Sequence, residues 1–175
     1  MNQKTNKIIV LVGVILAFGI ILGVLIQKQT INKTKEEIEK FLIEFRTDAV
    51  NCVQPISQSL NWRERWDLEC WDKVAKKYTT GEAYAVAMKE KQMFIDKASL
   101  NFYQYQKFEI KSLVPNVLKI DLKKGEAVGE TILDVVYFYS QRTQEVKVND
   151  VLKLKKINGK WYITQIGDFY DSKSF

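Results

Sequence analysis

The chain begins with a long apolar stretch that has no polar interruption. Residues 8–26 read IIVLVGVILAFGIILGVLI, nineteen apolar or glycine residues without a charge, an amide or a hydroxyl group. At about 1.5 Å of rise per residue, a helix of this length spans roughly 28 Å, close to the ~30 Å hydrocarbon core of a bilayer. Because lipid offers no hydrogen-bond partners, a helix is the natural structure for such a segment. The pattern predicts a single transmembrane helix over residues 8–26, after a short tail at residues 1–7.

Two interpretations of this segment compete. A secretory signal peptide usually has an apolar region of about 7–15 residues, which ends at a small-x-small cleavage site. Here the run is longer, and residues 27–31 (QKQTI) contain no such site, so we expect a retained anchor. Gly19 and Gly23 form a GxxxG pattern, which lets two helix backbones approach closely and makes this face a candidate dimer contact. Glycine is also common in membrane helices that have no such role, and this is the simpler explanation here.

The lysines beside the segment bear on its orientation. Three of them (Lys28, Lys33 and Lys35) follow it and two precede it, which favours a cytoplasmic C-terminus when only positive charges are counted. A short basic tail, a long apolar run and a folded C-terminal domain also describe a signal anchor whose domain is exported. We favour a single-pass protein of the cell membrane with an extracytoplasmic domain.

After a basic juxtamembrane segment at residues 27–33, the apolar positions follow a helical period. Thr34 and Glu37 have the spacing of a capping box and predict a helix start. Apolar residues then step by four and three along one stripe, at Ile38, Leu42, Phe45, Ala49 and Cys52. Pro55 ends this helix. The soluble domain is expected to cover residues 34–175.

Two further helices are expected before residue 100. Asn61 with Glu64 marks the start of one that runs to about Tyr78, and its apolar face holds Trp62, Trp66, Cys70 and Val74. Thr79 with Glu82 repeats the capping-box spacing. The helix that follows covers about residues 81–97 and is expected to bury Ala83, Ala87 and Phe94.

From residue 102 the period changes to two, as expected of strands with one solvent-facing side. Phe108 and Ile110 alternate with charged residues, and residues 118–122 and 145–154 show the same alternation. Residues 128–140 (VGETILDVVYFYS) are apolar on both sides, as in a central strand, and Asn158-Gly159 is a two-residue hairpin signal. The order predicts an α+β domain in which three helices pack on a curved antiparallel sheet of four to five strands.

The formal net charge of +6 is concentrated at the N-terminus. Residues 1–35 hold five lysines and no acidic residue, which leaves 22 basic and 21 acidic residues in the rest of the chain, a net charge of +1. Lysines next to the predicted span suit anionic lipid headgroups. A nucleic-acid-binding domain normally carries its own basic face. Because this chain has no obvious run of Lys and Arg, we expect no direct nucleic-acid binding.

The chain has two cysteines and no histidine. The absence of histidine excludes zinc sites built on His and catalytic triads that depend on it, and we expect no metal, no cofactor and no catalytic residue. Cys52 and Cys70 lie on neighbouring predicted helices. In an exported domain they could form a disulfide worth roughly 3 kcal/mol. In the cytoplasm they would be small buried apolar residues.

The C-terminal hairpin carries a family resemblance. Its sequence LKLKKINGKWYITQI, with a lysine-rich strand, an Asn-Gly turn and the strand Trp161-Tyr162-Ile163, resembles the nuclear-transport-factor-two-like (NTF2-like) cone fold, a cystatin-like architecture. The resemblance covers about residues 34–170 and implies helices packed in the concavity of the sheet. With one N-terminal membrane helix, the chain also resembles the bitopic VirB-type assembly subunit of type IV secretion machines and its counterparts in Gram-positive conjugation systems. That resemblance implies a non-catalytic scaffold that forms homo-oligomers and contacts other channel proteins.

The first hypothesis for function is therefore a membrane-tethered scaffold that acts through protein-protein contacts. Surface aromatics such as Tyr103, Tyr105 and Tyr139 are candidate interface residues, because aromatics are enriched at interface hot spots, although for any one of them a place in the core is the simpler expectation. A second hypothesis is a ligand-binding or regulatory cone domain. Trp62, Trp66 and Trp71 could line its cavity, but their helical spacing more often indicates core packing.

The third hypothesis is a cone-fold enzyme of the isomerase or dehydratase kind. Asp134 shares a strand face with Ile132 and Val136, so its carboxylate could be desolvated and serve as a general base. The alternative is an aspartate at a solvent-facing position that is hydrogen-bonded to a neighbour. No second acid, histidine or oxyanion donor accompanies Asp134 in the sequence, so we expect no enzyme and favour the scaffold.

Overall fold

The computed structural model describes residues 3–100 and 104–167, with side chains from residue 19 onward. The chain divides into two units, residues 1–37 and residues 38–175. One helix, α1 (Gln3–Asn51), runs through the boundary between them. The helix start predicted at Thr34 is therefore wrong, and residues 27–33 are helical. These residues contain neither proline nor glycine, so no helix breaker interrupts α1 here. Within the helix, the Thr30 hydroxyl donates to the Ile26 carbonyl at 2.9 Å, as a mid-helix threonine can.

In the part of the chain with described side chains, no helix combines the length and apolarity needed to cross a membrane. The span predicted at residues 8–26 lies partly outside that part, because the side chains of residues 3–18 do not belong to it. Gly19 and Gly23 are exposed on α1, and an added Cβ at either position would meet no described atom within 4 Å.

The second predicted helix is divided into two. Helix α2 (Trp62–Arg65) begins where expected, because the side chain of its N-cap Asn61 accepts the Arg63 amide. Trp66 is extended, and α3 (Leu68–Tyr78) begins anew after Asp67. The Asp67 carboxylate accepts the Glu69 and Cys70 amides at 3.1 and 3.2 Å. This side-chain cap competes with a continuous helix and restarts it.

The third predicted helix is present as α4 (Glu82–Ser99), but its cap differs from the prediction. The N-cap is Gly81, with a φ of 58°, and it makes no side-chain cap hydrogen bond. The Thr79 hydroxyl instead donates to the Ala75 carbonyl at 2.7 Å, so it closes α3 rather than opening α4. Along α4, Ala83 and Phe94 are buried as expected, whereas Ala87 is half-buried.

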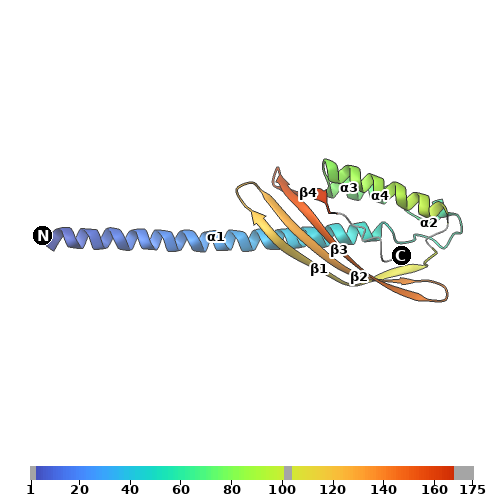
Figure 1. The fold of residues 1–175 in the computed structure, drawn as a ribbon, viewed down its shortest axis with the longest axis horizontal. Helices are drawn as coiled ribbons and strands as arrows, with labels where there is room; N and C mark the ends of the chain where they lie inside the picture. The colour runs from blue at the N-terminus through green and yellow to red at the C-terminus, as the bar shows by residue number, and fades with distance from the viewer. Residues whose placement is uncertain (1–2, 101–103, 168–175) are drawn as a thin grey trace. The chain divides into compact units, whose positions relative to one another are not determined.

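The C-terminal half forms one four-stranded antiparallel sheet, as Figure 1 shows. The strands follow one another in the order β1 (Lys107–Asp121), β2 (Glu126–Phe138), β3 (Thr143–Ile157) and β4 (Lys160–Ile166). Strand β2 is interior, as its two-sided apolar pattern predicted. The Asn158-Gly159 hairpin is confirmed, because both residues have positive φ, 50° and 82°, and join Ile157 to Lys160. Strand β1 is an edge strand, which explains how it accommodates Pro115.

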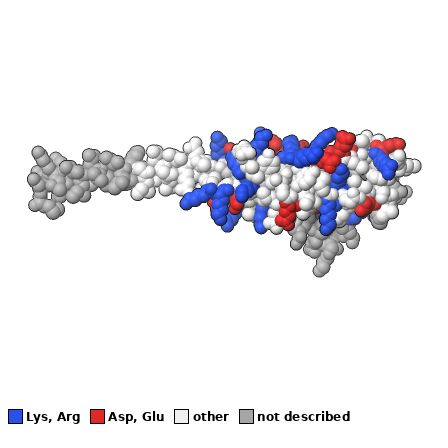
Figure 2. Space-filling view, turned by 90° about the horizontal axis from the view of Figure 1, so that it is seen from above, with Lys and Arg blue, Asp and Glu red and all other residues white. Residues whose placement is uncertain are grey.

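The helices and one face of the sheet enclose two core clusters. The first cluster joins α1, α3 and α4 to the end of the sheet where the β1–β2 and β3–β4 turns lie. It contains Ile38, Leu42, Phe45, Tyr78, Ala83, Ala127, Leu152, Leu154, Trp161 and Ile163. The second contains Val50, Trp66, Phe94, Ala98, Tyr105, Phe108, Leu133 and Val135. Gly129 allows α1 to approach β2, since a Cβ there would lie 2.8 Å from the Leu42 Cδ1 atom. Figure 2 shows positive and negative side chains spread over one face of the domain.

Candidate functional site

A buried ion pair joins α1 to the sheet. Arg46 is one helical turn after Leu42 and lies on the inward face of α1, while Asp150 lies on the inward face of β3 between Val148 and Leu152. The two side chains pair, with the carboxylate fully excluded from solvent and the guanidinium 12% exposed. A charge buried in this way is tolerable only when it is paired. The pair therefore fixes where α1 rests on the sheet within residues 38–175.

Two further polar groups lie near this pair. Thr131 faces Asp150 across the β2–β3 register and is fully buried. Glu90 on α4 is half-buried, and burial raises the pKa of its carboxyl group, an effect that Arg46 partly opposes. Burial in turn lowers the pKa of Arg46 to about 10, with Glu90 acting in the opposite direction. The guanidinium is still charged at neutral pH. Its ion pair joins α1 to β3, and Thr131 of β2 and Glu90 of α4 lie beside it.

A second polar cluster joins α1 to the end of α3. The Asp48 carboxylate accepts hydrogen bonds from the Tyr78 hydroxyl at 2.6 Å and the Lys77 ammonium at 2.9 Å. These two hydrogen bonds lower the pKa of Asp48. Burial and, after it, the hydrogen bond to Asp48 raise the pKa of Tyr78. Hydrogen bonds to Tyr78 and to Asp48 raise the pKa of the exposed Lys77. The anionic form of Asp48 is thus the form that the folded domain favours.

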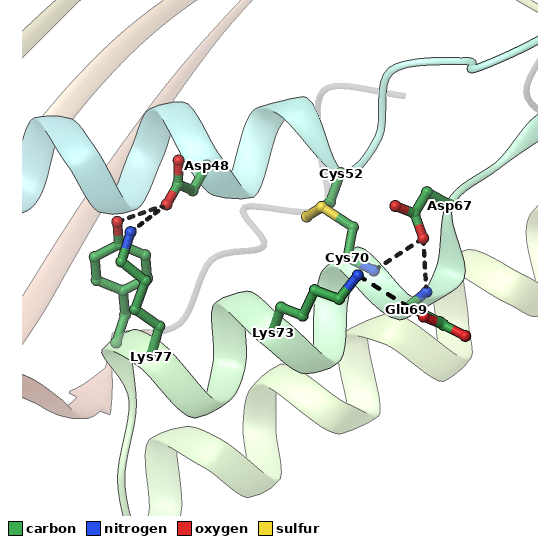
Figure 3. Close-up of a disulfide and its surroundings, with 8 residues drawn as sticks. Asp48, Cys52, Asp67, Glu69, Cys70, Lys73 and Lys77 are labelled. Carbon is green, nitrogen blue, oxygen red and sulfur yellow. Dashed lines mark hydrogen bonds and ion pairs between the residues drawn. A yellow bond between two sulfur atoms is a disulfide. The ribbon is translucent and has the colours of Figure 1, made fainter.

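A disulfide lies beside this cluster, as Figure 3 shows. The structure joins Cys52, just after the end of α1, to Cys70 in the first turn of α3, with a Cα–Cα distance of 5.3 Å. The cap made by Asp67 holds Cys70 in that first turn. Of the two states that the sequence leaves open for these cysteines, this is the bonded one. The disulfide, the hydrogen bonds of Asp48 and its ion pair with Lys77 together attach the C-terminal end of α1 to α3.

The three tryptophans singled out from the sequence all belong to the packing of the second core cluster. Trp66 is 3% exposed, and its ring centroid lies 5.2 Å from that of Phe94 and 5.4 Å from that of Tyr105. Trp62 is half-buried and packs against the same second core cluster.

The three tyrosines singled out as interface candidates differ in their surroundings. Tyr105 is buried and its hydroxyl donates to the Val53 carbonyl at 2.6 Å, so it belongs to the core. Tyr139 is half-buried at the β2–β3 turn, under the guanidinium of Arg142. Tyr103 lies outside the described residues.

Asp134 lies on the sheet face opposite Leu133 and Val135, which are in the second core cluster. Its carboxylate accepts the Ser112 hydroxyl at 2.6 Å, and Lys147 is its register partner on β3. This is the hydrogen-bonded alternative to a desolvated base. Within the described residues, no three His, Cys, Asp or Glu side chains gather as a metal site would require.

Sequence reasoning missed Arg46, Glu90, Thr131 and Asp150. A signal for two of them was present. Asp150 occupies an inward position of the β3 alternation, and Arg46 falls in the apolar stripe of α1, four residues after Leu42. Two opposite charges, each at a core position of its own element, are a pattern that predicts a buried pair. The sequence gives no indication of which elements would bring them together.

Comparisons with known proteins add little to this geometry. No family model and no curated protein sequence matches the chain. Among solved structures, it is similar to the intermembrane space region of the chloroplast protein ARC6, with a TM-score of 0.39 and 11% identity over 54% of this chain and 75% of that chain. At this TM-score the similarity bears on neither the fold nor the function.

Proposed function

We propose that this protein is a membrane-anchored, non-catalytic scaffold of a type IV secretion or conjugative DNA-transfer channel. It acts by self-association and by contacts with other channel proteins. The domain is NTF2-like in this proposal, and residues 8–26 are its membrane span. The observation that carries the proposal is the continuity of α1, which leads from the apolar segment directly into the core of the folded domain.

The attachment of α1 supports a scaffold role. Within residues 38–175, α1 is held by the Arg46–Asp150 pair, by the bonds of Asp48 to α3 and by the disulfide. Burying the Arg46–Asp150 charges carries a desolvation cost, whereas the disulfide and the hydrogen bonds of Asp48 stabilise the same end of the helix, so several kinds of interaction fix α1 in the domain. They suit a domain that must hold a defined position beside a membrane.

The disulfide supports the proposed location. Disulfides persist in oxidising compartments and are rare in reducing cytoplasm. A bond between Cys52 and Cys70 therefore favours an extracytoplasmic domain over the cytoplasmic C-terminus that the flanking lysines favour. Export also agrees with the signal-anchor interpretation of the N-terminus.

Site-specific photo-crosslinking in cells tests the proposal. A crosslinker placed at Val114 or Val151, both exposed on the sheet, should give discrete products with a second copy of the chain or with envelope proteins encoded near it. A crosslinker at buried Leu152 is the matched control and should give none of these products. If every exposed position yields only monomer, the scaffold proposal fails. If the protein leaves the membrane fraction in carbonate washes, the proposed membrane anchor is wrong, whatever the crosslinking shows.

A further inference from the structure

Two hairpins at one end of the sheet carry a dense positive charge. In an antiparallel meander the β1–β2 and β3–β4 turns lie at the same end, as Figure 1 shows. We name residues 119–126 and 153–160 the hairpin end. It holds seven lysines and two acidic residues. All seven lysines are exposed: Lys119, Lys123, Lys124, Lys153, Lys155, Lys156 and Lys160.

The two acidic residues do not neutralise this end. Asp121 accepts the backbone amides of Lys123 and Lys124 at 3.1 Å and thereby closes the turn. Glu126 pairs with Lys155 at 3.5 Å. The hairpin end thus keeps a local excess of five positive charges, although residues 36–175 have a net charge of only +1. The charge of the domain is therefore distributed unevenly, and Figure 2 shows blue side chains prevailing over one part of the domain.

Exposed aliphatic side chains lie among these lysines. Leu122 in the β1–β2 turn is 40% exposed, and Ile157 beside the β3–β4 turn is 38% exposed. Leu118, one residue before the hairpin end, is 57% exposed. Basic residues around exposed aliphatic ones are typical of surfaces that bind a lipid interface, where the charges meet headgroups and the apolar groups enter the acyl boundary.

The polypeptide enters the domain at this same end. Ile38, the first residue of the folded unit, and Leu42 belong to the core cluster that contains Ala127 and Leu154, which are register partners next to the hairpin turns. An anchor preceding residue 38 would therefore hold the hairpin end, rather than the opposite end, at a high local concentration beside the bilayer.

We propose that the hairpin end binds the anionic lipid surface of the membrane in which the chain is anchored. This inference rests on the proposed membrane anchoring. A nucleic acid is the other polyanion to consider, but single-stranded nucleic acids are bound through aromatic stacking. The exposed apolar residues of this end are aliphatic, and Trp161 is only 8% exposed.

The test uses the full chain in lipid vesicles. Leu122→Cys is labelled with an environment-sensitive fluorophore without reductant, so that the Cys52–Cys70 disulfide stays closed. In phosphatidylcholine vesicles with about one third phosphatidylglycerol, the label should show a blue-shifted emission that 0.5 M NaCl reverses. In pure phosphatidylcholine the shift should be absent. A label at Ser140→Cys, in the β2–β3 turn at the opposite end of the sheet, should show no emission shift with either kind of vesicle.

Matched variants separate this surface from general charge. The hairpin variant K119Q/K123Q/K124Q/K160Q should show no shift at the lipid concentration that saturates the wild type. The concentration of anionic lipid needed for a half-maximal shift should rise at least tenfold. The control variant K73Q/K76Q/K89Q/K147Q removes the same charge from exposed positions elsewhere and should keep the shift. Equal signals in both lipids, or equal loss in both variants, would overturn the inference.

Two further outcomes are informative. A single-stranded oligonucleotide is added to the labelled protein on anionic vesicles. If it reverses the Leu122→Cys emission shift at a phosphate concentration below that of the anionic lipid, the hairpin end is a nucleic-acid site and the lipid inference is wrong. If the unlabelled chain fails to float with pure phosphatidylcholine vesicles after reconstitution, the membrane anchor itself is wrong. A salt-sensitive Leu122 signal with anionic vesicles would then still show that the hairpin end binds lipid.

Discussion

Arg46 on α1 and Asp150 on β3 form an ion pair in the interior of the domain, with the carboxylate fully excluded from solvent. The pair lies between two apolar clusters and near Thr131 and Glu90. Its energetic value is asymmetric. Replacing both partners with apolar residues is often neutral, whereas removing one leaves an uncompensated buried charge.

Arg46→Met should therefore destabilise the domain by about 3–5 kcal/mol, because Asp150 stays buried without its partner. The double variant Arg46→Met/Asp150→Leu should recover most of that loss. Urea unfolding of the purified full chain, followed by tryptophan fluorescence, measures both. A loss below about 1 kcal/mol in the single variant would show that the pair does not hold α1 in place.

Asp48→Asn should weaken the domain by about 1 kcal/mol at pH 7, since the partly exposed carboxylate accepts two hydrogen bonds. The pKa of Asp48 is lowered in the folded state, so its contribution is complete above the unfolded value of about 3.9 and is lost as pH falls below it. The variant should show a shallower loss of stability than the wild type as pH falls below about 4. Glu44→Gln is the control, at an exposed position where the Glu44 Oε1 atom lies 3.9 Å from the Lys40 Nζ atom. It should leave the loss of stability at acid pH as it is in the wild type.

Removal of the disulfide should cost about 3 kcal/mol in the chain-entropy model, because the bond closes a loop between residues 18 apart. We expect Cys52→Ser/Cys70→Ser to lower the thermal midpoint, and reductant to lower that of the wild type equally. Reductant should leave the double variant unchanged. A wild-type midpoint that is insensitive to reductant would contradict the bond.

Gly129→Val should destabilise the domain by about 1–3 kcal/mol, because the new side chain would displace Leu42 in the packed core. Ala85→Val is the control, since it adds methyl groups at an exposed position of α4. Chemical unfolding distinguishes the two. Equal effects would show that α1 does not approach β2 at Gly129.

Local patterns predicted much of the secondary structure. The alternation of Phe108 and Ile110 with charged neighbours, the two-sided apolar run over residues 128–140 and the Asn158-Gly159 turn all correspond to strands and a hairpin in the sheet. The break at Trp66 was missed, because the Asp67 side chain caps a new helix inside an apolar repeat that reads as continuous. The continuity of α1 past Thr34 was missed because a capping-box spacing can also occur within a helix.

The apolar N-terminal segment, the change of period from helices to strands and most apolar positions that face inward follow from the amino-acid sequence alone. Which inward positions meet depends on the folded domain: Arg46 with Asp150, Gly129 with Leu42, and Cys52 with Cys70. The period of the apolar residues indicates the buried face of an element, because removing apolar side chains from water is favourable along that whole face. A specific pair depends on how separate elements pack against one another, and that information is not present in any one of them.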